Sequence, residues 1–281
     1  MESGPGRQVT MKGMKKRLIA AILTVFCVSF AHADGWKNDK IWYDGLAEKA
    51  VYSASRVVYG KPRGYQAVFI VCKERHDRKT LTKADNSTDT IEVWKFNQVE
   101  DIPTPNYTYH YLTTVHFATK DWTLTRLDCG ESEWCGTSFK QIIRLPDDSG
   151  WDYRAFSYMP QAGTVRTSLA AQSLFLPLDS LPLALRDFDF AAAKDLTFST
   201  YPTQKSNKQT MGQVLPAIAH LAGEEDGSFK IDLSVDGKPS GTYWFAKDRL
   251  HVMTRYESAD KSQRYELKSV DRVNYWTIKG E

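Results

Sequence analysis

The greatest concentration of chemically reactive side chains lies in the segment Asp128–Gly136, which reads DCGESEWCG. Glu131 and Glu133 could transfer protons, and Cys135 could act as a nucleophile if a nearby histidine lowered the pKa of its thiol. An enzyme that uses Glu131, Glu133 and Cys135 is therefore one hypothesis for this chain. The alternatives for the same segment are a turn between two strands and a loop that contacts a ligand.

Motifs of familiar enzymes do not occur elsewhere in the sequence. The chain has no G-x-S-x-G, no H-E-x-x-H, no phosphate-binding P-loop and no G-x-G-x-x-G that opens a helix. His110 and His116 are six residues apart, which separates them by about 20 Å in a strand, too far to bind one metal ion. His76 lies in the charged stretch Lys73–Lys79 and is expected to be exposed. The sequence therefore predicts no metal site and no cofactor.

Aromatic residues give the main indication of a binding function, since the chain contains 8 Trp and 14 Tyr residues. Four tryptophans at predicted strands or strand ends are candidate ligand-binding residues: Trp122, Trp134, Trp151 and Trp244. On a curved sheet, such side chains can line a hollow that binds an acyl chain or another apolar ligand. The alternative is a large β core, since aromatic side chains favour strands.

Three further candidate ligand-binding residues, Arg56, Tyr59 and Arg63, lie close to one predicted hairpin, whose connection is Gly60–Gly64. The two arginines could orient the anionic head group of an amphipathic ligand, because guanidinium groups form strong hydrogen bonds with anions. The alternative interpretation of these three residues is a solvated turn.

Residues 1–33 have the features of a secretory signal peptide. The basic residues of Lys15–Arg17 precede the uncharged run Leu18–Phe30, and Ala31–Ala33 has small residues at the positions that a signal peptidase reads. The apolar run is shorter than the roughly 20 residues that a membrane-spanning helix needs. We therefore expect cleavage after Ala33, a periplasmic protein, and no transmembrane segment after cleavage.

Export changes the charge of the chain and the chemistry of its cysteines. Residues 1–33 carry five basic residues and one acidic residue, so residues 34–281 retain 32 basic and 33 acidic residues. A nucleic-acid binder would need a surplus of basic residues, which this balance excludes. An exported compartment permits disulfides, and the short loop between Cys129 and Cys135 makes this pair the predicted disulfide. Cys72, in an apolar run, is expected to be a buried thiol.

The mature chain has the pattern of an antiparallel β protein. Ser228–Val235 alternates apolar and polar residues, and turn residues interrupt such runs every 8–12 positions. Short helices are expected at Asp179–Arg186 and at Trp42–Lys49. The predicted fold is mainly β: a large curved antiparallel sheet, either a half-barrel or an open barrel, with one or two short helices. Residues 34–281 are expected to form a single domain, or two subdomains divided near residues 170–190.

Four segments carry a resemblance to known proteins: Arg56–Val71, Lys83–Asp85, Val93–Asn97 and Glu133–Gly136, which read RVVYGKPRGYQAVFIV, KAD, VWKFN and EWCG. They resemble a family of uncharacterised exported proteins of Gram-negative bacteria, whose members often carry the label "septum formation inhibitor Maf". The resemblance covers residues 42–170 best, and it implies export but no particular activity. Maf nucleotide pyrophosphatases have an S-x-R-R-type phosphate-binding stretch near the N-terminus, which the mature chain lacks.

The C-terminal stretch Val235–Tyr256, which includes the motif WFAKD at Trp244–Asp248, carries a weaker resemblance. It resembles periplasmic lipoprotein-carrier domains of the LolA and LolB type. Those domains are curved antiparallel sheets that helices close around an apolar cavity, so the resemblance implies a sheet that encloses a ligand. This chain is longer and poorer in helix than those domains.

The leading hypothesis from these observations is a periplasmic, non-catalytic protein that binds an apolar or amphipathic ligand, or a partner in the cell envelope. The first alternative is the envelope enzyme described above. The second is a structural or interaction module that exposes the edge of a sheet, and an unpaired, weakly charged edge strand would favour it.

Overall fold

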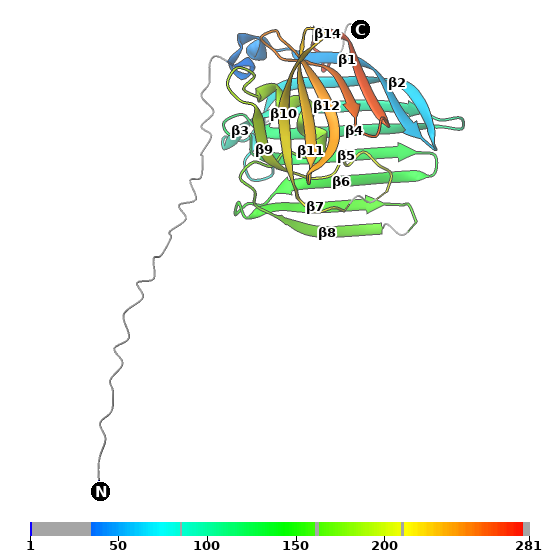
Figure 1. The fold of residues 1–281 in the computed structure, drawn as a ribbon. Coiled ribbons are helices and arrows are strands. Elements are labelled where there is room, and N and C mark those ends of the chain that lie inside the picture. The colour runs from blue at the N-terminus through cyan, green and yellow to red at the C-terminus, as the bar shows by residue number, and fades with distance from the viewer. Residues whose placement is uncertain (2–34, 85, 161–162, 209–210, 278–281) are drawn as a thin grey trace. The chain divides into compact units, whose positions relative to one another are not determined.

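The computed structural model describes Met1 and residues 35–277, apart from residues 85, 161–162 and 209–210 (Figure 1). The predicted signal peptide, beyond Met1, therefore lies outside the described residues.

A single antiparallel sheet of 14 strands makes up most of the described chain (Figure 1). In sequence order the strands are β1 (Ala47–Val58), β2 (Lys61–Asp77), β3 (Thr90–Pro103), β4 (Thr108–Ala118), β5 (Leu124–Glu133), β6 (Gly136–Arg144), β7 (Gly150–Ser157), β8 (Gly163–Ala170), β9 (Asp195–Thr200), β10 (Leu215–Glu225), β11 (Ser228–Val235), β12 (Lys238–Ala246), β13 (Met253–Ser258) and β14 (Gln263–Val273). Their order in the sheet is β8-β7-β6-β5-β4-β3-β2-β1-β14-β13-β12-β11-β10-β9. The prediction of a large antiparallel sheet is confirmed, and within the described residues the sheet is not closed.

The order follows from pairing between strands that are consecutive in the chain. The exception is β8 and β9, which lie at opposite edges of the sheet, and β1 pairs with β14 to join the two halves. Several of the turns contain only two residues, and two of them illustrate the geometry. Asp236-Gly237 connects β11 to β12, and Tyr59-Gly60 connects β1 to β2, with positive φ at both residues of each turn. This backbone geometry suits the twist of antiparallel strands and favours glycine. The predicted connection Gly60–Gly64 is therefore too long, because β2 already begins at Lys61.

Short helical segments lie at the N-terminal end of the described chain and between β8 and β9. They are η1 (Trp36–Asn38), η2 (Lys40–Tyr43), η3 (Leu178–Ser180), α1 (Leu181–Ala184) and η4 (Leu185–Asp187). The helix predicted at Asp179–Arg186 is confirmed, whereas that at Trp42–Lys49 is wrong beyond η2, because β1 begins at Ala47. Among the described residues, no helix has the length and apolar character needed to cross a membrane.

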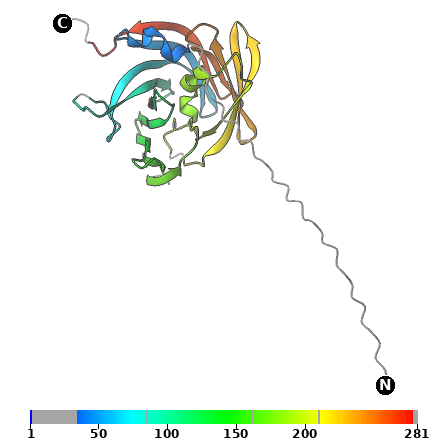
Figure 2. The ribbon, with the colours of Figure 1, turned by 90° about the vertical axis from the view of Figure 1, so that its left-hand side faces the viewer.

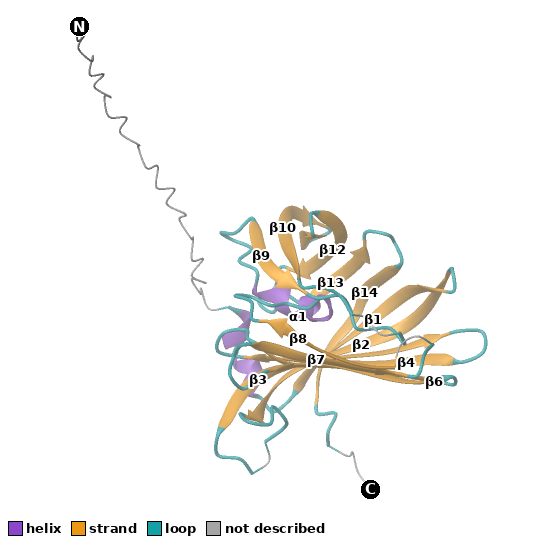
Figure 3. Ribbon diagram, turned by 90° about the horizontal axis from the view of Figure 1, so that it is seen from below, coloured by secondary structure: helices purple, strands orange, loops and turns teal. Residues whose placement is uncertain are grey.

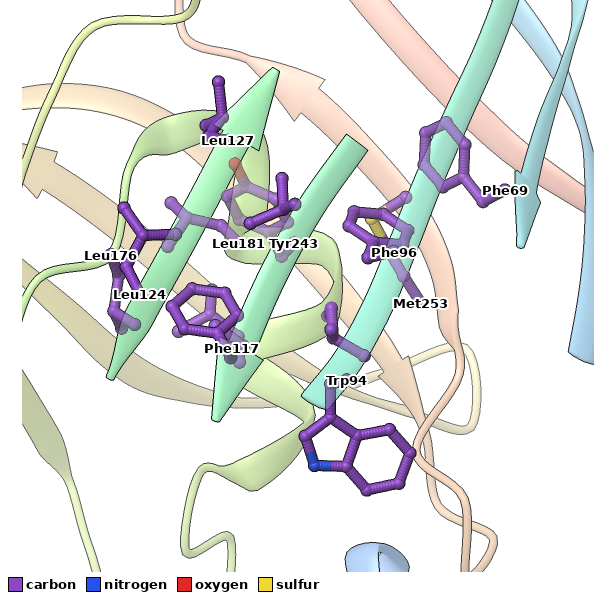
Figure 4. Packing of buried hydrophobic residues seen from close by; sticks show 14 of the residues in the cluster. Phe69, Trp94, Phe96, Phe117, Leu124, Leu127, Leu176, Leu181, Tyr243 and Met253 are labelled. Atoms are coloured by element: carbon purple, nitrogen blue, oxygen red, sulfur yellow. The ribbon is translucent and has the colours of Figure 1, made fainter. Parts of the chain in front are cut away.

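The second group of helices fills the concave side of the sheet. Figures 2 and 3 show α1 between β3–β7 on one side and β9–β13 on the other. Leu181, Leu183 and Leu185 are fully buried there. The core contains aromatic residues of β3 and β4 packed with this segment and with later strands, including Trp94, Phe96, Phe117, Leu176, Leu181, Tyr243 and Met253 (Figure 4). The chain's own residues therefore occupy much of the hollow that the sheet curves around.

A buried ion pair attaches the helical segment to the sheet. The Arg186 guanidinium donates two hydrogen bonds to the carboxylate of Glu48, at 2.8 and 3.0 Å, and a third to the Leu250 carbonyl oxygen. The side chains of Arg186 and Glu48 are only 2% and 3% exposed. The guanidinium also lies 4.6 Å from the ring centre of Trp36, within the range of a cation–π interaction. These contacts join η4, β1, η1 and the β12–β13 loop.

Candidate functional site

The most exposed aromatic side chains near the predicted site residues gather where three hairpins of the sheet turn. We call this region the hairpin end; it comprises the turn Tyr59-Gly60, the loop Thr104–Tyr107 and the turn Trp134-Cys135. The turns fall here because β1–β2, β3–β4 and β5–β6 are successive antiparallel pairs of similar register. Tyr59 and Trp134, both predicted as ligand-binding residues, are thereby brought to one end of the sheet.

A groove of about 330 Å³ lies at the hairpin end between the first two of these turns. Its lining residues are Tyr59, Lys61, Arg63, Thr104, Pro105, Asn106 and Tyr107. Known ligand pockets have volumes of roughly 300–1,000 Å³, so this groove is at the lower end of that range. Two of its lining residues are cations, and among the described residues that line it none is acidic. The groove therefore combines aromatic surface with positive charge.

Arg63 is the cation of the groove with a buried side-chain donor that lacks a partner among the described residues. It lies in β2 opposite Arg56 of β1, so both side chains point to the concave face. Arg56 donates a hydrogen bond to the carbonyl oxygen of Lys205 and lies over the ring of Tyr111. By contrast, Arg63 Nε is buried and has no hydrogen-bond partner among the described residues. A buried donor without a partner costs about 1–3 kcal/mol, so an external acceptor would be stabilising here.

A series of stacked rings extends from the groove to Trp134. The indole of Trp134, which is 82% exposed, stacks on Tyr107 with ring centres 5.8 Å apart. Tyr107 in turn contacts Tyr109, whose hydroxyl lies 2.5 Å from that of Tyr59. Burial raises the pKa of Tyr109 from its ordinary value of 10 to about 12, so its hydroxyl stays neutral well above pH 7. These rings form a largely apolar wall next to the two cations.

The predicted catalytic trio is divided between two environments. Glu131 points into the protein, where burial raises its pKa, and its Oε2 accepts a hydrogen bond from Ser138. Glu133 accepts a hydrogen bond from the backbone N–H of Cys135, and the Cys135 sulfur lies 3.4 Å from the Tyr107 hydroxyl. His110, across from Ser132 in the sheet, is exposed and pairs with Asp101. It does not supply the imidazole that activation of Cys135 would require.

The predicted disulfide between Cys129 and Cys135 is not found. All cysteines in the described residues, Cys72, Cys129 and Cys135, are free. Cys129 is buried in β5, and the four residues from there to Glu133 extend over about 13 Å. A disulfide needs Cα atoms within about 7 Å, which the extended strand prevents. The prediction that Cys72 is buried is confirmed.

In a sample that begins at Asp34 and so lacks Cys27, Cys135 is expected to be the reactive thiol of the folded protein. Burial raises the pKa of Cys72 to about 11 and that of Cys129 to about 12, whereas Cys135 is exposed. Ellman's reagent should therefore titrate about one thiol in the native protein and three after unfolding. The Cys135→Ser variant should lose the native signal. A native protein that shows no reactive thiol until it is reduced would contradict the free state of Cys135.

The other three tryptophans that the sequence suggested as ligand-binding residues are buried in the structure. Trp122 and Trp151 are buried in the core; the Trp122 indole donates to Asp187 of η4, and the Trp151 ring lies 4.5 Å from that of Phe175. Trp244 is buried beneath Arg255, whose guanidinium lies 3.9 Å from the ring centre. Trp122 and Trp151 both line a small cavity of about 120 Å³, which is much smaller than the roughly 300–1,000 Å³ of known ligand pockets.

A charged cluster lies in the interior next to the hairpin end. The ammonium of Lys205, in the segment that follows β9, donates to Glu100 Oε1 at 2.8 Å and to Gln98 Oε1 at 3.1 Å. Tyr65 and Tyr265 donate to the other carboxylate oxygen of Glu100. Burial by itself raises the pKa of Glu100, but the Lys205 ammonium and these hydrogen bonds hold it below its ordinary value. The cluster therefore holds Glu100 as a carboxylate.

Sequence reasoning missed a second cluster, formed by Glu74, His76 and His116. The expectation that His76 is exposed is wrong, because its side chain is 2% exposed. Most of the stretch Lys73–Lys79 belongs to β2, which ends at Asp77, and successive side chains of a strand point to opposite faces. This alternation places Glu74 and His76 on one face. The alternation in the sequence could therefore have placed Glu74 beside His76, but nothing in the sequence indicated that His116 lies next to them.

The edge strand β8 is relevant to the hypothesis of an interaction module that exposes the edge of a sheet. In the described sheet, β8 pairs only with β7, and its single charged residue, Arg166, forms an ion pair with Asp152. Leu112, Phe139 and Phe156 lie in one row across β4, β6 and β7 and are exposed. An edge with little charge beside exposed apolar side chains is suited to pairing with another chain.

Comparisons with known proteins identify no family for this chain. No protein-family profile matches the chain, and neither does any curated protein. Among solved structures, the chain is similar to a beta-barrel-like protein of a domain of unknown function, DUF1849, from Brucella abortus. The two share 10% sequence identity with a TM-score of 0.47, over 82% of this chain and 98% of that one.

Proposed function

We propose that this protein binds an amphipathic ligand with an anionic group, without catalysis, and that it does so in the periplasm. The binding site is the groove at the hairpin end, where Arg63 and Lys61 contact the anionic group and the rings of Tyr59, Tyr107 and Trp134 contact the apolar part. The observation that carries this proposal is the buried Nε of Arg63, which has no partner among the described residues. None of the residues that line the groove belongs to the main hydrophobic core cluster, so a ligand can bind there without displacing that core.

The expected energies support one role for the cations, which bind the anionic group, and another for the aromatic rings, which bind the apolar part. A hydrogen bond between charged groups contributes about 1.5–3 kcal/mol. Apolar surface contributes about 25 cal/mol for each Å² that binding removes from water, and Trp134 has most of its surface available. The anionic group would fix the orientation of the ligand, whereas the rings would accept apolar groups of varied shape.

Lysophospholipids that differ in head-group charge test this proposal. Protein freed of co-purified lipid by unfolding and refolding is mixed with palmitoyl-lysophosphatidylglycerol or palmitoyl-lysophosphatidylcholine below the micelle concentration. Native mass spectrometry and tryptophan fluorescence should show one equivalent of the anionic lipid bound more tightly than the zwitterionic one. Arg63→Met should weaken binding of the anionic lipid by about 10- to 100-fold, which corresponds to the loss of one charged hydrogen bond.

Two further variants separate the aromatic wall from general surface effects. Trp134→Ala should weaken the binding of both lipids, since it removes the exposed ring. Trp276→Ala, which removes a half-exposed tryptophan that contacts Tyr275 and does not line the groove, is the matched control and should leave binding unchanged. Failure of the wild type to bind either lipid would contradict the proposal, as would equal affinities of the wild type and Arg63→Met.

An interaction module is the second candidate function, and the edge of β8 favours it. In this case the partner would be another protein of the cell envelope that adds a strand at that edge. The β8 edge and the groove involve different residues, so the groove variants Arg63→Met and Trp134→Ala should leave such pairing intact.

A further inference from the structure

Three side chains with metal-binding groups converge on the convex face of the sheet. Glu74 and His76 come from β2, and His116 comes from β4, two strands away in the sheet. Between them on β3 lies Val93, which pairs with Glu74 on one side and Ala118 on the other. Val93 and Ala118 have small side chains, so Glu74, His76 and His116 can meet above β3.

The distances among the three groups are close to those of a coordination shell. Glu74 Oε1 lies 2.8 Å from His76 Nε2 and 3.4 Å from His116 Nε2, and all three ligand atoms lie within 4.8 Å of one another. Zinc binds imidazole nitrogen and carboxylate oxygen at about 2.0–2.2 Å, which places ligand atoms about 3.3 Å apart in a tetrahedral site. Small rotations of the side chains would therefore accommodate an ion.

Burial sets this cluster apart from the other histidine–carboxylate pairs. His76 and His116 are 2% and 6% exposed, whereas the pairs His110–Asp101 and His220–Asp195 are more than half exposed. The backbone pairs His76 with Ile91 on one side and with Lys83 on the other, because the chain after β2 turns back and bonds to its end.

We propose that Glu74, His76 and His116 form a binding site for a divalent transition-metal ion, with Zn²⁺ as the ion that suits these ligands. Two histidines and one glutamate leave a fourth position for water, a ligand set that occurs in zinc proteins. The ion would connect β2 to β4 across β3 and stabilise the folded state through its binding free energy.

The surroundings of the ligands predict moderate affinity. Nδ1 of His76 and Nδ1 of His116 are buried and have no hydrogen-bond partner among the described residues. Loss of such outer partners typically weakens metal binding by about 10- to 100-fold. The ammonium of Lys95 lies 3.3 Å from Glu74 Oε2 and opposes a second positive charge. Because Lys95 is partly exposed, its side chain can move toward solvent when the ion binds.

Zinc titration of chelator-treated protein tests this site. Isothermal titration calorimetry should show one equivalent of Zn²⁺ bound, and the melting temperature should rise with zinc concentration. His116→Gln and Glu74→Gln should each lower the affinity by more than about 100-fold, beyond the effect of losing an outer partner. His110→Gln, which changes an exposed histidine of the same strand, is the matched control and should bind zinc as the wild type does.

Cobalt provides a measurement that depends on no variant. The wild-type protein with one equivalent of Co²⁺ should show visible absorption bands of a four-coordinate site with nitrogen and oxygen ligands. Wild-type protein that binds neither ion would overturn the proposal, even if the variants failed to fold. Zinc binding that persists unchanged in both His116→Gln and Glu74→Gln would also overturn it. The groove at the hairpin end takes no part in these measurements.

Discussion

The Arg186→Met variant is expected to lose about 3–5 kcal/mol of its free energy of unfolding, the usual effect of removing one partner of a buried ion pair. The substitution leaves the Glu48 carboxylate buried without the guanidinium that now gives it two hydrogen bonds. It also leaves the Leu250 carbonyl oxygen without its donor and removes the cation from the Trp36 ring. Urea unfolding measures the loss, and the melting temperature should fall by roughly 6–20 °C for a chain of this size.

Two controls make this first prediction specific. The double variant Glu48→Leu/Arg186→Met should regain most of the lost stability, because it removes both charges and leaves no buried carboxylate unpaired. Arg264→Met breaks an exposed ion pair with Glu266 and should change stability by less than about 1 kcal/mol. A single variant as stable as Arg264→Met would show that Arg186 does not hold η4 against the sheet.

The sequence predicted the fold because its signals are local. Alternation of apolar and polar residues in segments such as Ser228–Val235, and turn residues such as Asp236-Gly237, specify strands and hairpins without knowledge of distant contacts. Successive hairpins then build an antiparallel sheet. The contents of its concave side are not a local property. A leucine in α1 and a ligand would satisfy the aromatic residues of β3 and β4 equally well, so the filling of the hollow could not be predicted.

The candidate sites were predictable only where their residues are close in the chain. Tyr59 lies in one turn and Arg63 lies at the start of the strand that follows it, so their proximity followed from that hairpin. The meeting of His76 with His116 depends on the register of β2, β3 and β4, which the loops between them determine. The charged stretch around His76 also suggested exposure. In the structure Lys73 of that stretch is largely buried, with its ammonium 4.7 Å from the ring centre of Trp94.

Lys205→Met is expected to lower the free energy of unfolding at pH 7 by about 3–5 kcal/mol, because Glu100 would remain buried as an unpaired carboxylate. The measurement that distinguishes this cause from lost packing is the pH dependence of urea unfolding. In the wild type the pKa of Glu100 is below its unfolded value of about 4.3 despite burial, owing to Lys205. Its contribution is therefore present above that pH and is lost as the pH falls through the lower, folded pKa.

The variant should show the opposite dependence. Without Lys205, burial raises the pKa of Glu100 above its unfolded value, so the folded state takes up a proton as the pH falls from 7 toward 5. The difference in stability between the wild type and Lys205→Met should therefore narrow over this range. Glu100→Gln/Lys205→Met, which has no carboxyl group to titrate at this position, is the control. Its free energy of unfolding should differ from that of the wild type by a constant amount between pH 7 and 5.

If the difference in free energy of unfolding between the wild type and Lys205→Met itself stayed constant over this range, Glu100 would remain ionised through other contacts. Its hydrogen bonds from Tyr65 and Tyr265, rather than the ammonium, would then stabilise the charge.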